Sequence, residues 1–138
     1  MSQLVQEKTA VGNRSWRDDW PVAVTAAGAA AGVWVLATQV AGADLAVRAG
    51  SGTQQVGLVS VVVTSLVVSV AGSALLRLLQ RRTPRGTAIW TAIAASVWVV
   101  SFTGPLGARS AAAGLWLVAL HLVVGAVVLF GLRSRRAA

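Results

Sequence analysis

The sequence contains no cysteine, a single histidine and only four acidic residues among its 138 positions. The absence of cysteine excludes disulfides, thiol redox chemistry and thiolate metal sites. One histidine cannot form a metal site by itself, and the glycines do not form a phosphate-binding loop or a nucleophile elbow. We therefore predict no metal site and no cofactor.

Long apolar stretches make up most of the chain. Apolar residues account for 56% of the sequence, and the mean hydropathy of +0.72 exceeds what a soluble core of this size needs. Four segments have the roughly 20 residues that a helix needs to cross a bilayer: 21–42, 56–79, 87–104 and 111–132. The predicted fold class is all-α, an integral membrane four-helix bundle over 21–132, between a polar segment at 1–20 and a basic tail at 133–138.

Basic residues gather on one side of this predicted bundle. Ten of the twelve precede the first span, surround the second connection or follow the fourth span: Lys8, Arg14, Arg17, Arg77, Arg81, Arg82, Arg85, Arg133, Arg135 and Arg136. The other two connections carry only Arg48 and Arg109. Because positive residues stay in the cytoplasm, we predict a multi-pass membrane protein with both termini cytoplasmic.

The net charge of +8 is explained by contact with anionic lipid headgroups. The arginines flank the membrane spans and form no groove or stripe, so we expect no nucleic-acid partner. Arg77, between leucines near the end of the second span, is expected only to reach the headgroups with its side chain.

Small and polar side chains occur at helical spacing in the first two spans. One face of the first span gathers Thr25, Gly28, Gly32, Gln39 and Gly42. We expect this face to meet another helix, within the chain or in a dimer, since a GxxxG pair lets backbones approach. In the second span, three serines lie one turn apart and are expected to bond to carbonyls one turn earlier or to a neighbouring helix: Ser65, Ser69 and Ser73.

The six tryptophans fall into two groups. Three lie near predicted span boundaries, where an aromatic ring anchors a helix at the headgroup level: Trp16, Trp20 and Trp90. The other three lie deeper, where they either fill space or form the wall of a cavity for a flat or apolar ligand: Trp34, Trp98 and Trp116.

His121 lies about midway along the fourth span, near the predicted bilayer centre. An ionisable group at this depth is costly, so its ring must face the bundle or water. Gly114 and Gly125 lie on the same stripe before and after it, and they would let another helix approach and supply a partner, with Gln39, Ser101 and the second-span hydroxyls as candidates. The histidine then either holds helices together in its neutral form, or handles a proton or binds a ligand.

The connections carry further signals. Asp44 and Arg48 are four residues apart, and they pair if the first helix continues or lie at a cavity mouth if it ends. The segment 50–55 is predicted to be a flexible polar connection. Pro84 and the sequence around it predict a turn between the second and third spans, and Gly104 with Pro105 predicts the end of the third span and a turn.

Three short patterns resemble an actinobacterial family known as domain of unknown function 6069. They are Ala43-Asp44-Leu45, Ser101-x-x-Gly104-Pro105-Leu106 and the run from Leu120 to Val124, and the similarity covers roughly residues 21 to 133. The resemblance implies four spans and an actinobacterial plasma membrane, but it brings no activity. It draws attention to Asp44, Ser101, Pro105 and His121.

Three functional hypotheses remain open. In the first, the protein binds a lipophilic ligand, membrane lipids or a membrane partner. In the second, it is a small isomerase or cyclase in which His121 and Asp44 handle protons. The third is a homo-oligomeric channel or exporter, although the first span lacks the carboxylate that proton coupling needs. The candidate ligand-binding residues are His121, Ser101, Trp98, Trp116, Trp34, Gln39, Asp44 and Arg48.

Overall fold

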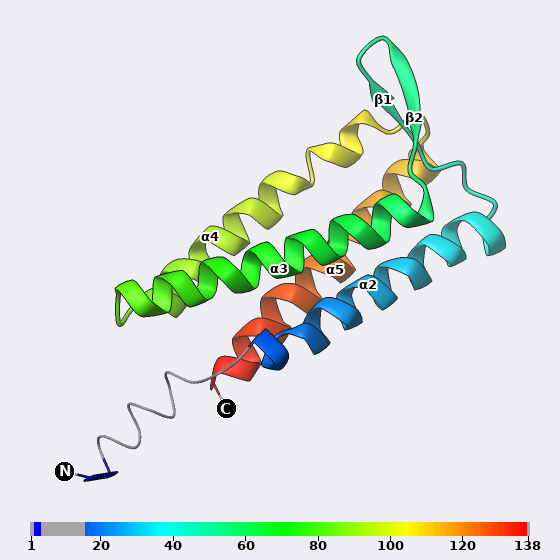
Figure 1. The fold of residues 1–138 in the computed structure, drawn as a ribbon. Coiled ribbons are helices and arrows are strands. Elements are labelled where there is room, and N and C mark those ends of the chain that lie inside the picture. The colour runs from blue at the N-terminus through cyan, green and yellow to red at the C-terminus, as the bar shows by residue number, and fades with distance from the viewer. Residues whose placement is uncertain (1, 4–15, 138) are drawn as a thin grey trace.

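The computed structural model describes residues 2–3 and 16–137, which form four long antiparallel helices and one short β-hairpin (Figure 1). The long helices are α2 (Trp20–Val35), which continues as the π-helical segment η2 (Leu36–Val40), α3 (Leu58–Arg82), α4 (Gly86–Ser101) and α5 (Ala111–Ala137). Short 3₁₀ helices, η1 (Trp16–Asp18) and η3 (Gly104–Gly107), precede α2 and follow α4. The strands are β1 (Ala46–Ala49) and β2 (Gly52–Gln55).

Each of the four helical segments, with η2 counted in the first and η3 in the third, is long and apolar enough to cross a membrane, by length and composition. The all-α membrane bundle predicted from the sequence is therefore confirmed, and the chain is a membrane protein. The predictions for Lys8, Arg14 and the side chains of Trp16 and Arg136 lie outside what the structure describes.

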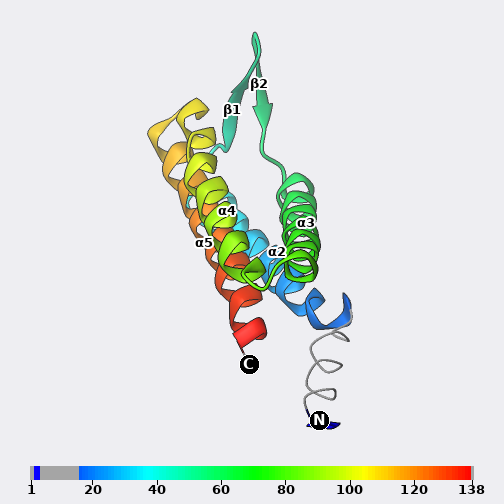
Figure 2. The same cartoon turned by 90° about the vertical axis from the view of Figure 1, so that its left-hand side faces the viewer.

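The helices pack in a ring in chain order, so that α2 and α4 each contact both α3 and α5. The start of α2 and the end of α5 lie at one end of the bundle, where Arg135 Nη1 donates a hydrogen bond to the Asp18 carbonyl at 3.1 Å. We call this the terminal end; the hairpin protrudes from the opposite end, the hairpin end (Figures 1 and 2).

Alanines form most of the buried face of α2, in place of the glycine and polar face expected from the sequence. The buried side chains are Val22, Ala23, Ala26, Ala27 and Ala30, and Ala37 follows on η2. The expected face is exposed along its length, and a Cβ added at Gly28 or Gly32 would meet nothing within 4 Å. The prediction that this face meets another helix is thus wrong within the described chain, because methyl side chains on the opposite face already permit close packing.

Three serines lie on the buried face of α3, as the sequence predicts. Ser65, Ser69 and Ser73 donate to the carbonyls four residues earlier at 2.8, 2.7 and 2.9 Å. Each hydroxyl is therefore satisfied within its own helix and presents a small surface to the bundle.

An ion pair joins α2 and α3 at the terminal end. Arg77 donates from Nε and Nη2 to Oδ2 of Asp19, at 3.0 and 2.7 Å. Both side chains are largely buried, with exposed fractions of 14% for Arg77 and 5% for Asp19. The expectation that Arg77 only reaches toward headgroups is wrong, since its guanidinium turns inward to a carboxylate far away in the sequence.

The connection between α2 and α3 forms the hairpin, so the prediction of a flexible segment at 50–55 is wrong. Ala46 pairs with Gln55 and Ala49 with Gly52, across a two-residue turn that begins at Gly50 with φ +60°. A glycine at the first central position is typical of a type II′ turn, whose twist matches antiparallel strands. The segment before α5 also holds the hairpin in place, since Arg109 Nη1 donates a hydrogen bond to the Thr53 hydroxyl at 2.6 Å.

Two helix ends follow the predicted turn chemistry. The α3–α4 turn brings Gly86 so close to α3 that an added Cβ would lie 2.5 Å from the Leu79 carbonyl oxygen. At the other end, α4 stops at Ser101 and the chain turns through η3, with Pro105 buried. Both turns are confirmed.

Candidate functional site

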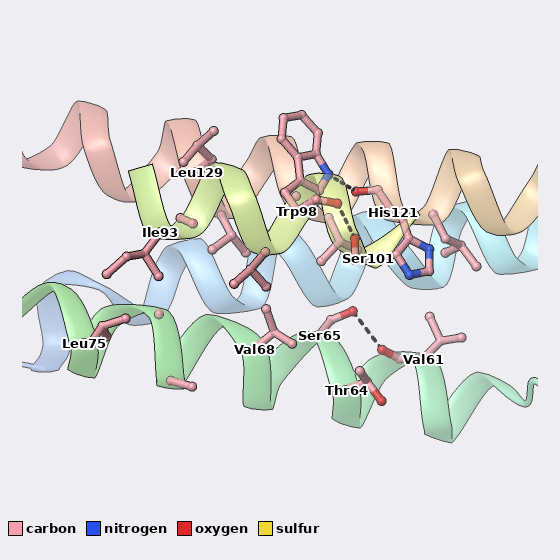
Figure 3. Close-up of a pocket in the computed structure, with 18 of the residues that line it drawn as sticks. Val61, Thr64, Ser65, Val68, Leu75, Ile93, Trp98, Ser101, His121 and Leu129 are labelled. Carbon is pink, nitrogen blue, oxygen red and sulfur yellow. Dashed lines mark hydrogen bonds between the residues drawn. The ribbon is translucent and has the colours of Figure 1, made fainter. Parts of the chain in front are cut away.

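A cavity of about 520 Å³ lies among α3, α4 and α5 (Figure 3). It arises because α3 and α4 lie together at their connecting turn and separate toward the hairpin end (Figures 1 and 2). Its volume lies within the range of pockets that hold small molecules. The cavity is therefore a candidate ligand site.

The cavity is closed on the α5 side and open between α3 and α4. On α5 its walls include Leu117, Leu120 and Val128, which are all buried. At the opposite rim, Val68 of α3 is 47% exposed and Val97 of α4 is 62% exposed. Since both rim residues lie within apolar spans, the opening faces sideways, toward the hydrocarbon region that surrounds a membrane helix.

Trp90 closes the cavity toward the terminal end. Its side chain is 1% exposed and its Nε1 donates to the Gly72 carbonyl at 2.9 Å. A Cβ added at Gly72 would be in ordinary van der Waals contact with the indole, 4.0 Å away, so the ring does not require glycine at this position. The prediction that Trp90 anchors the protein at the headgroups is wrong, because the packing of α3 against α4 buries it.

Trp98 joins α4 to α5 beside the cavity. Its Nε1 donates to the backbone carbonyl of His121 at 2.8 Å. The ring lies directly on the α5 backbone at Gly125, where a Cβ would overlap the indole. The space that Gly125 leaves next to His121 is therefore occupied by an indole ring of α4, which bonds the backbone of His121 and not its imidazole.

The His121 ring extends from α5 toward the α3 side of the cavity (Figure 3). Its Nδ1 lies 2.7 Å from the carbonyl oxygen of Leu117, one turn earlier on the same helix. None of the expected partners forms a hydrogen bond with the imidazole among the described residues: Gln39 is exposed on η2, Ser101 donates to the Trp98 carbonyl at 2.6 Å, and the buried serines of α3 donate to carbonyls of their own helix. The prediction of a polar partner from another helix is wrong; Phe102 of the α4 C-cap contributes only a ring, with its centroid 6.1 Å away.

Polar groups occur mainly in the half of the cavity near the hairpin end. His121, Ser101, Ser60, Thr64 and Ser65 lie there, whereas the half near Trp90 is lined by aliphatic side chains. Among the described residues His121 is the sole titratable side chain in the lining. The cavity thus has one polar end and one apolar end.

The other predicted site residues lie elsewhere. Trp34 Nε1 donates to the Val56 carbonyl at 2.7 Å, and Trp116 packs against a buried cluster that contains Leu45. Asp44 and Arg48 are exposed near and on the hairpin, and because the helix ends at Val40 they form no helical pair. The structure therefore brings together His121, Ser101 and Trp98 from the predicted set, and does not place Asp44 in the lining.

Sequence reasoning singled out Trp98 and Ser101 but did not recognise that one face of α4 forms a wall of the cavity. The lining residues of α4 lie three, four, seven, eight and eleven positions after Trp90, which places them on one helical face: Trp90, Ile93, Ala94, Val97, Trp98 and Ser101. This periodicity was visible in the sequence, but it does not tell a cavity wall from a packed face.

A family model described as a family of unknown function, DUF6069, matches residues 11–138, so the chain belongs to this family. Searches of curated proteins and of solved structures found no match.

Proposed function

We propose that this member of the DUF6069 family binds a lipophilic small molecule, which enters the α3–α4–α5 cavity from the bilayer. The observation that carries the proposal is the sideways opening at Val68 and Val97, into a cavity with apolar walls and one imidazole. Pockets of this size bind through apolar contact and use a few polar groups for orientation. A molecule dissolved in the membrane reaches this opening without crossing water.

The enzyme hypothesis receives less support from the cavity. General acid–base chemistry on a bound molecule uses groups within hydrogen-bond reach of it. In the described lining His121 is the one group that can exchange a proton, and Asp44 is not part of that lining. Binding needs no second group. The oligomeric channel stays a prediction.

We further propose that the protein lies in a bacterial plasma membrane with its terminal end in the cytoplasm. The described arginines support this orientation: Arg17, Arg77, Arg81, Arg82, Arg85, Arg133 and Arg135 belong to the terminal end, against Arg48 and Arg109 at the hairpin end. Because the chain has no cysteine, single cysteines at Ser51 and Pro84 report each side in intact cells. A membrane-impermeant maleimide labels only the Ser51→Cys variant if the proposal holds, and labelling of Pro84→Cys alone would reverse the orientation.

Native mass spectrometry of the protein, extracted gently from its own membrane, tests the binding proposal. Ala94→Leu adds bulk to the cavity wall, and Ala92→Leu makes the same change at an exposed position outside the lining. We expect the wild type and Ala92→Leu to retain a small molecule that Ala94→Leu loses. Equal occupancy in the wild type and both variants, or ordinary phospholipid as the sole bound species, would contradict the proposal.

A further inference from the structure

The hydrogen bond at Nδ1 determines which hydrogen-bonding group His121 presents to the cavity. A backbone carbonyl only accepts hydrogen bonds, so the contact between Nδ1 and the Leu117 oxygen, at 2.7 Å, requires the proton to reside on Nδ1. In the neutral ring Nε2 then carries a lone pair and can accept a hydrogen bond. No described residue donates a hydrogen bond to Nε2.

The neighbouring polar side chains do not donate a hydrogen bond to Nε2. Ser65 and Ser101 donate their hydroxyl protons to backbone carbonyls of their own helices. Ser60 and Thr64, on the α3 wall, form no hydrogen bond with any described residue and are exposed at the cavity. An acceptor and two hydroxyls therefore border the same apolar space, where an unmet hydrogen-bonding group is costly.

From this arrangement, and resting on the proposed function, we infer that the ligand is a lipophilic alcohol or phenol whose hydroxyl donates a hydrogen bond to Nε2 of His121. A hydroxyl also accepts a hydrogen bond, so Thr64 or Ser60, which line the cavity on α3, can donate to it. Ketones, quinones, esters and ethers only accept hydrogen bonds, so they leave Nε2 without a donor. A carboxylate has the same defect, and no cation occurs among the described lining residues.

The same arrangement orients the molecule. The hydroxyl lies at the His121 end, and the hydrocarbon part points along α4 and α5 toward Trp90. Eight residues separate Trp98 from Trp90 on α4 and His121 from Leu129 on α5, which gives roughly 12 Å of apolar wall on each helix at 1.5 Å per residue. A chain or ring system of that length fits between these walls.

Nitrogen-15 NMR of histidine in lipid nanodiscs tests the inference on the intact protein. The chain has a single histidine, so both ring signals belong to His121. The probes are 1-decanol and decyl methyl ether, which have the same chain but differ in the ability to donate. We expect the free protein to carry the proton on Nδ1, and 1-decanol to shift the Nε2 signal saturably at about tenfold lower concentration than the ether.

Matched variants separate the polar contact from general binding. Thr64→Val removes a cavity hydroxyl and should reduce the preference for the alcohol, whereas Thr91→Val, which lies outside the cavity lining, should leave it unchanged. Equal binding of both probes, lost together in Ala94→Leu, would overturn the hydroxyl inference and leave the proposed function standing. A proton on Nε2 in the free protein would also overturn the inference. Saturable binding of neither probe would count against both proposals.

Discussion

Breaking the Asp19–Arg77 ion pair should destabilise the bundle strongly. The change is Arg77→Met, which keeps much of the side-chain volume but leaves the Asp19 carboxylate, 5% exposed, without the guanidinium. Removing one partner of a buried pair costs about 3–5 kcal/mol. Because Arg77 keeps 14% exposure, we expect the lower value, about 3 kcal/mol, or roughly 150-fold in the unfolding equilibrium constant.

Reversible unfolding in mixed detergent micelles, followed by tryptophan fluorescence, measures this loss. The control is Arg81→Met, which removes the same charge one turn later at an exposed position and should change stability little. The double variant Asp19→Leu with Arg77→Met replaces the pair by apolar groups and should recover most of the loss. The reasoning fails if Arg77→Met costs no more than Arg81→Met, or if the double variant is as unstable as the sum of its parts.

Three further predictions concern packing. Gly125→Ala forces the indole of Trp98 off α5 and should cost about 1–3 kcal/mol in the same unfolding assay, while Gly28→Ala, with open space around it, should be neutral; equal effects would refute the close approach. Trp90→Phe loses a buried hydrogen bond and should lower the free energy of unfolding by at least about 1 kcal/mol. An unchanged unfolding midpoint would contradict this prediction. Gly50→Val places a branched residue at φ +60° and should raise amide hydrogen exchange within the hairpin alone; unchanged exchange would show that the turn does not need glycine.

Much of the fold follows from local sequence signals. The length of the apolar segments predicted the four spans, and the turn chemistry at Pro84 and Pro105 predicted where α3 ends and where α4 begins and ends. The hairpin was missed although its signal was present: Gly50 and Ser51 form a glycine-first dipeptide between two short segments, as in type II′ turns. The polar character of the segment was read as flexibility, because strands this short contain few apolar residues.

The remaining features depend on which faces meet, and this was not visible locally. Asp19 and Arg77 are separated by 58 positions, so neither residue indicates the other. Likewise, Trp90 lies near the end of an apolar segment. A tryptophan at such a position is compatible both with anchoring at the headgroups and with burial, so the residue type does not decide between the two. The depth of His121 correctly predicted a ring that faces the bundle, but its partner on the same helix was as compatible with the sequence as one on another helix.

Photolabelling with a diazirine-bearing long-chain alcohol tests the central claim most directly, because it reports where a lipophilic molecule lies on the protein. Mass spectrometry of the labelled peptides in native-like membranes should show saturable labelling of cavity positions such as Val68 and Val97, which unlabelled 1-decanol displaces. Val63 and Val67 are as exposed on α3 but lie outside the cavity, and they should show only weak, non-saturable labelling. Equal, non-saturable labelling of all four valines would contradict a ligand-binding cavity.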